Sequence, residues 1–209
     1  MNSVFSNIRT AGDFFRSLKW AWQRATRGYC DLDTYDIGDW FLNTLPDMLE
    51  SIKHSRTGFL SVLEEKGIEH FGLTNINEYH SAPDELRRKI DDYCNEKWGE
   101  ILSEMIFLLR EATWNTCSKV NPYEEKYHRI SEEFREKYGE WGEKLWREEE
   151  KAQAKKTGST PMYLPSHLQE YKYISELYLN EEGKISEYQD QCKNKALELF
   201  SKWFYALCI

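Results

Sequence analysis

Apolar residues recur at spacings of three and four along most of the chain, and the strict alternation typical of strands is nearly absent. This pattern predicts an all-α protein, built as a single globular helical domain of about five to seven helices, with a C-terminal helical extension as a variant. The expected long helices span residues 10–26, 36–54, 83–117 and 121–145, and a short one begins at Ser61 and is expected to end at Gly67.

Glycine and proline residues mark where these helices are expected to end, bend or begin. Gly28 ends the first helix. Pro46 falls inside the second and is expected to kink it or to reset its start, because proline removes a backbone donor. Asn121 and Pro122 form the clearest start signal in the chain, since asparagine caps a helix and proline suits its first position.

The best candidate for a linker is the glycine- and proline-containing segment 157–166. It divides the chain into a helical core, residues 1–156, and C-terminal helices, residues 167–209, which we expect to pack on that core. Gly183 is a possible break within the C-terminal helices, so that segment contains one or two of them.

The amino-acid composition indicates a protein with a buried core and argues against DNA binding and membrane spans. Of the 209 residues, 40% are hydrophobic and 15% aromatic, which is enough apolar surface for a buried core. The net charge of −8 argues against direct DNA binding, which needs a basic surface. No apolar run approaches the roughly 18 residues that span a bilayer, so we expect a cytosolic protein with no membrane partner. The aromatic content is also compatible with a homo-oligomer.

The sequence predicts no metal site, no cofactor and no catalytic residue. The five cysteines are odd in number and widely spaced, which indicates reduced thiols. Glu125 and His128 form a single E-x-x-H pair, whereas a di-iron site needs two. Asp31 and Asp33 resemble the start of an EF-hand loop, but Leu42 stands where its last ligand should be. We therefore expect a protein that is not an enzyme.

One region, residues 16–41, departs from the pattern of apolar stripe and solvated charge. Residues 1–30 hold five basic and one acidic side chain, and residues 31–50 hold six acidic and no basic ones. Arginine forks bind phosphate, aromatic rings stack on bases, and aspartates accept from ribose hydroxyls. The candidate ligand-binding residues are Lys19, Trp20, Gln23, Arg24, Arg27, Tyr29, Asp31, Asp33 and Trp40.

The same residues support two other interpretations. Arg24 and Arg27 can pair with Asp31, Asp33 or Asp36 in an internal ion-pair network, and the tryptophans can belong to the core. The region can also be a surface for a partner protein. The opposite face of the first helix is apolar and consists of Phe14, Leu18, Ala21, Trp22 and Ala25.

Two sequence blocks resemble a family of small proteins encoded by tailed bacteriophages and prophages. Residues 19–33 read KWAWQRATRGYCDLD, similar to the family's AWQR-x-x-RGY-x-D-x-D pattern, although Cys30 and Tyr35 stand where serine and tryptophan are expected. Residues 96–106, EKWGEILSEMI, resemble its EEW-x-x-IL-x-x-MI block. The resemblance covers roughly residues 17–113 and implies a phage origin and action in the cytoplasm of a host bacterium. It transfers no functional residue.

Three functions follow as hypotheses. The first is an anti-defence binding protein that sequesters a nucleotide-derived immune signal, a cyclic nucleotide or an ADP-ribose derivative, without catalysis. The second is an acidic inhibitor of a host defence protein such as a CRISPR nuclease, in which the Glu-rich residues 124–151 imitate phosphates. The third is a phage structural or assembly protein.

Overall fold

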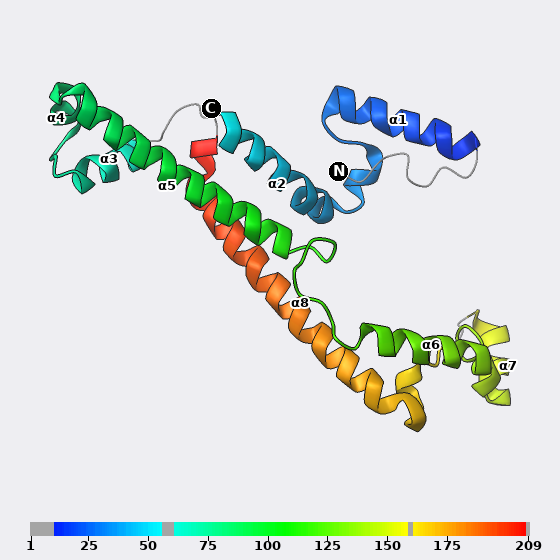
Figure 1. Ribbon diagram of the computed structural model, residues 1–209. Helices are drawn as coiled ribbons and strands as arrows, with labels where there is room; N and C mark the ends of the chain where they lie inside the picture. Colours follow the sequence, from blue (N-terminus) through cyan, green and yellow to red (C-terminus); the bar gives the residue numbers. More distant parts are fainter. Residues whose placement is uncertain (1–10, 56–60, 159–160, 208–209) are drawn as a thin grey trace. The chain divides into compact units, whose positions relative to one another are not determined.

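The computed structural model describes residues 11–55, 61–158 and 161–207. Over these ranges the chain forms eight α-helices and four short 3-10 helices, with no strand (Figure 1). The all-α prediction is confirmed. The chain divides into two compact units, one formed by Met1–Cys117 with Gln189–Ile209 and the other by Ser118–Tyr188.

The elements of the first unit are α1 Ala11–Arg27, η1 Asp31–Thr34, α2 Ile37–Ser55, α3 Ser61–His70, α4 Ile76–Ser81 and α5 Asp84–Glu111. Those of the second unit are α6 Glu124–Tyr138, η2 Glu143–Leu145, α7 Glu148–Thr157 and η3 Pro165–His167. Two elements complete the chain: α8 Gln169–Trp203, which runs through both units, and η4 Phe204–Leu207.

Helix α5 is the centre of the first unit, and α2 and α3 both pack against it. The crossing of α3 over α5 is close: a Cβ on Gly67 would lie 2.6 Å from the sulfur of Cys94. The Cys94 thiol, in turn, donates to the carbonyl oxygen of Leu63 at 3.2 Å. The expectation that Gly67 ends this helix is therefore wrong. The glycine serves the packing of α3 on α5, and the helix continues to His70.

The C-terminal part of α8 packs along α5 in the same unit (Figure 1). Trp203 meets Trp98 of α5 edge-on at 5.9 Å between ring centroids, and Lys195 pairs with Glu104 at 2.8 Å. Helix α8 is continuous over its 35 residues, so Gly183 does not break it.

In the second unit, α6 packs on the first part of α8. The rings of Tyr127 and Tyr178 stack at 4.1 Å. The buried Asn121 side chain donates to the carbonyl oxygen of Tyr178 at 3.1 Å and to Glu182 at 2.8 Å, and it accepts from the Tyr123 amide. Asn121 thus anchors the segment before α6 on α8, and the helix itself begins three residues later than its predicted cap.

Two helix ends predicted from the sequence need correction, and two helices were not predicted. Helix α6 ends at Tyr138, before Gly139, and does not reach residue 145. Helix α5 ends at Glu111 and does not reach residue 117. Helices α4 and α7 were not expected; α4 forms because the Asn75 side chain accepts from two amides of its first turn. Pro46 lies inside α2, as predicted. None of the described helices is long and apolar enough to cross a bilayer.

Candidate functional site

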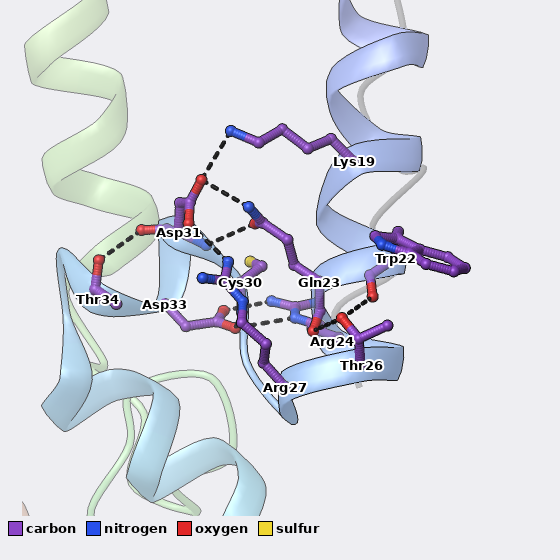
Figure 2. A network of polar contacts seen from close by, with 10 residues as sticks. All are labelled: Lys19, Trp22, Gln23, Arg24, Thr26, Arg27, Cys30, Asp31, Asp33 and Thr34. Carbon is purple, nitrogen blue, oxygen red and sulfur yellow. Dashed lines mark hydrogen bonds and ion pairs between the residues drawn. The ribbon is translucent and has the colours of Figure 1, made fainter.

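The predicted cluster of basic and acidic residues forms around the turn that joins α1 to η1. Gly28 adopts φ +81°, a left-handed conformation that suits glycine, and its amide donates to the Arg24 carbonyl oxygen at 3.0 Å. The chain therefore reverses, and the aspartates of η1 lie against the polar side of α1 (Figure 2).

Asp31 is the centre of this cluster. Its carboxylate accepts from Lys19 at 2.8 Å, from the Gln23 amide at 2.8 Å and from Arg27 at 2.9 Å (Figure 2). Gln23 also accepts from the Asp31 backbone amide at 3.0 Å, so the two residues bind each other through both groups. Hydrogen bonds from Lys19, Gln23 and Arg27 hold the pKa of Asp31 well below its usual range.

A second pair, Arg24 and Asp33, fastens η1 to α1 more firmly. Arg24 donates from Nε to one carboxylate oxygen at 3.1 Å and from Nη2 to the other, which is the two-point geometry that arginine favours. The Asp33 side chain is only 8% exposed, and it also accepts from the amide of Cys30 at 2.7 Å. The Arg24 hydrogen bond is the main reason why the pKa of Asp33 falls to about 2.

The structure thus brings six of the nine candidate residues together, and these six bind one another: Lys19, Gln23, Arg24, Arg27, Asp31 and Asp33. Each of these donors already binds one of the two aspartates, which would compete with a phosphate for it. Of the remaining three, Tyr29 lies under the Arg27 guanidinium at 5.2 Å, and Trp20 and Trp40 are half-buried. The assignment of these nine residues to a ligand stays a prediction, and the geometry is that of an internal ion-pair network.

The apolar face of α1 points away from this network. Trp22 is 71% exposed and Phe15 is 69% exposed, and the ring of Trp22 extends to the side opposite the ion pairs (Figure 2). Phe14 and Leu18 are also exposed, whereas Ser17 on the polar side is buried. Trp22 is therefore not a core residue. The helix is held through its charged side, which leaves the apolar side open.

A cleft of about 620 Å³ lies next to the network, between the end of α1, η1 and α2. Its lining combines four aspartates with aromatic, apolar and small polar side chains. The lining residues are Arg24, Gly28, Leu32, Asp33, Tyr35, Asp36, Asp39, Trp40, Asn43, Thr44, Asp47, Met48 and Ser51.

Three of the four aspartates have no cationic side chain as a partner in the described ranges. Asp36 accepts from the amide of Asp39, and Asp39 accepts from the Asn43 side chain at 2.9 Å, but neither pairs with a cation in the described ranges, and the same holds for Asp47. Arg24 is the one basic side chain among the described residues that line the cleft, and Asp33 already neutralises it. The cleft is therefore anionic and partly aromatic.

Most of the α2 wall of this cleft was not among the candidate residues. Asn43, Asp47, Met48 and Ser51 follow Trp40 at spacings of three and four, so they share one face of the helix. The available signal was the absence of any basic residue from positions 31–50. A solvated helix face normally mixes both signs of charge, and this one does not.

The chain matches no protein family model, no curated protein and no solved structure. Within the part of the chain that the structure describes, no three His, Cys, Asp or Glu side chains are grouped closely enough to hold a metal ion. The site is therefore interpreted from its own geometry.

Proposed function

We propose that this protein is a non-catalytic binding protein whose anionic cleft holds a basic segment of a partner protein. The observation that carries the proposal is the α2 wall, where Asp36, Asp39 and Asp47 lie beside Trp40 with no neutralising cation in the described ranges. Lysine and arginine side chains suit such a wall because their charged heads pair with carboxylates while their stems cover apolar surface.

The dimensions of the wall suit a short helix or an extended peptide. From Asp36 to Ser51 the helix is about 22 Å long at a rise of 1.5 Å per residue. The exposed ring of Tyr35 and the half-buried ring of Trp40 flank the carboxylates, so an arginine or lysine can lie over a ring and pair with an aspartate at once.

The sequestration of a nucleotide-derived signal is supported less well. A phosphate in the cleft would face three unneutralised carboxylates, and the arginine and lysine donors that were assigned to it already bind Asp31 and Asp33. Repulsion between the phosphate and these carboxylates would weaken binding. Displacing an aspartate from its ion pair would also cost the free energy of that pair.

The resemblance to phage proteins supplies a setting for the proposal. In an infected bacterium, the basic partner would be a host defence protein whose nucleic-acid-binding surface is rich in lysine and arginine, and a CRISPR nuclease is one example of that class. The protein would act in the host cytoplasm by covering that surface. This setting extends the inhibitor hypothesis, and it moves the acidic contact from residues 124–151 to α2.

Isothermal titration tests the proposal with two synthetic peptides and a nucleotide panel. The first peptide is amphipathic, rich in Lys and Arg, and about 16 residues long, which matches the length of the wall at 1.5 Å per residue. We expect it to bind, and we expect its affinity to fall as the salt concentration rises. The same peptide with glutamates in place of its basic residues should not bind. Cyclic nucleotides and ADP-ribose derivatives are expected to give no heat.

Matched variants assign the binding to the cleft. The double variant Asp39→Asn with Asp47→Asn should bind the basic peptide with an affinity at least tenfold lower, because it lacks two of the three carboxylates that have no cationic partner. Asp92→Asn, on the exposed side of α5, removes an aspartate outside the cleft and should change nothing. Equal loss in both variants, or stoichiometric binding of an intact nucleotide without peptide binding, would overturn the proposal.

A further inference from the structure

We infer that a second copy of this chain occupies the cleft through its own α1, in a two-fold dimer in which each α1 lies in the cleft of the partner copy. The inference rests on the proposed function, because it names one occupant of the same anionic cleft. It is carried by two surfaces that the described part of one chain leaves uncovered, the apolar face of α1 and the cleft beside α2.

The apolar face of α1 forms a continuous ridge. Phe14, Leu18 and Trp22 follow one another at intervals of four residues, and Phe15 lies beside them. Two alanines, Ala21 and Ala25, fall on the same face, so a neighbouring backbone can approach closely there. In the structure these four large side chains are all exposed.

The helix cannot turn this ridge inward against its own unit. Its opposite side is tied to Asp31 and Asp33 by the contacts of Lys19, Gln23, Arg24 and Arg27. Rotating α1 about its axis would break every one of these bonds. The ridge is thus fixed in an outward orientation, and none of the residues that the structure describes covers it.

The cleft presents the complementary surface. Tyr35 is 88% exposed, and Leu32 and Met48 are also exposed, so apolar groups lie beside the free carboxylates of Asp39 and Asp47. An incoming helix therefore needs an apolar ridge with a basic edge. In α1 the edge is Lys19, which lies about 60° from Trp22 around the helix at 100° per residue and is 62% exposed. Lys19 shares the carboxylate of Asp31 with Arg27, so this group of three residues keeps one net positive charge.

Basic and acidic residues are also separated along the chain, as a contact between a basic helix and an acidic cleft requires. Residues 1–30 hold five basic and one acidic side chain, and residues 31–50 hold six acidic and no basic ones. Within one copy this asymmetry is partly used by the α1–η1 pairs. Asp36, Asp39 and Asp47 are left over, and they attract the basic segment of another copy.

The area agrees with a stable dimer. At roughly 150–250 Å² for a whole aromatic side chain, the exposed parts of the α1 ridge amount to about 450 Å². Those of the apolar side chains at and around the cleft, Leu32, Tyr35, Trp40 and Met48, amount to about 400 Å². Each copy would bury both surfaces, hence about 850 Å², close to the roughly 800 Å² per partner of a standard interface. The ridge paired only with itself would bury about half of that. A two-fold axis makes the ridge-to-cleft contact twice and closes the assembly.

Sedimentation equilibrium with two complementary variants tests the inference. The natural chain should sediment at twice 25.0 kDa. Trp22→Glu damages the ridge and keeps the cleft, and Asp39→Lys with Asp47→Lys damages the cleft and keeps the ridge, so each variant alone should be monomeric. Their mixture should contain a heterodimer, because one intact ridge meets one intact cleft. Leu18→Glu serves as a second ridge variant, and circular dichroism checks that the helices are retained.

The outcomes separate the inference from the proposed function. A monomeric natural chain, a mixture that stays monomeric, or species that keep growing beyond the dimer would overturn the inference. Titration of the Trp22→Glu variant with the basic peptide tests the cleft alone: we expect binding at least as tight as that of the natural chain, because no second copy competes. Peptide binding by a monomeric natural chain would refute the dimer and support the proposed function. A natural chain that forms a dimer, with a Trp22→Glu variant that does not bind the peptide, would support the dimer and refute the proposed function.

Discussion

The ion pair between Arg24 and Asp33 predicts a measurable loss of stability when Arg24 is replaced by alanine. The pKa of Asp33 falls from 3.8 to about 2 in the folded protein, chiefly through the hydrogen bond from Arg24. One pKa unit corresponds to about 1.4 kcal/mol, so the surroundings stabilise the charged carboxylate by about 2.5 kcal/mol. The Cys30 amide supplies part of this, and Arg24 is 35% exposed and therefore screened. We expect Arg24→Ala to lower the free energy of unfolding by about 1–2 kcal/mol.

Urea unfolding of a double-mutant cycle isolates the pair. The cycle combines Arg24→Ala with Asp33→Ala, and the coupling energy should be about 1–2 kcal/mol. The control is Arg88→Ala in α5, which removes an exposed arginine for which the described residues offer no acidic partner and should cost under about 0.5 kcal/mol. A coupling energy below about 0.5 kcal/mol would refute the view that this pair fastens η1 to α1.

The same pair has a defined pH dependence. The folded pKa of Asp33 lies below its unfolded value, so its contribution to stability is present above about pH 4 and is lost as the pH falls through about 2. The difference in unfolding free energy between the natural chain and Arg24→Ala should therefore shrink over that interval. A difference that is constant from pH 7 to pH 2 would contradict the assignment.

Three further predictions concern the packing of the helices. Gly67→Ala should destabilise the protein by about 1–3 kcal/mol in urea unfolding, since the new Cβ would lie 2.6 Å from a buried sulfur, whereas Gly99→Ala, with open space around it, should gain up to about 1 kcal/mol. Asn121→Ala should cost about 1–3 kcal/mol in thermal unfolding, because a buried carbonyl and a carboxylate lose their donor; an unchanged midpoint would refute this role. Tyr79 donates to Asp91 at 2.7 Å, which raises the pKa of its phenol to about 12, so its stabilising contribution is present below about pH 10 and lost through about pH 12. Tyrosinate absorbance should show Asp91→Asn lowering that pKa, and an unaltered titration curve would contradict the contact.

The fold class was predictable because helical periodicity is a local property of the sequence. The errors fall where distant residues decide the outcome. Gly67 is a common terminator, but here it allows α3 to pass close to α5, and nothing near it in the sequence announces that crossing. Gly183 is equally ambiguous in sequence, and the helix runs through it with open space where a Cβ would lie.

The sequence indicated which residues would lie close together in the candidate site, but not which of them would bind one another. The spacing of basic residues on one helix face, followed by Asp31 and Asp33, correctly indicated that these groups would lie together. Whether they bind each other or a ligand depends on the turn at Gly28, which sets the distance between them. The outward apolar face of α1 was unforeseen for the same reason: an amphipathic pattern indicates two faces but does not say which face is anchored.

The division of the chain into units sets an order for its biosynthesis. Ser118–Tyr188 is contiguous, so a nascent chain contains everything this unit needs as soon as residue 188 has left the ribosome. The other unit is discontinuous, and Trp98 and Phe41 receive their partners, Trp203 and Phe200, only from the end of α8. During translation these two rings therefore lack those partners until residues 200–203 have been synthesised. Chaperones that bind emerging apolar segments would encounter the first unit to be synthesised, which is also the last to be completed.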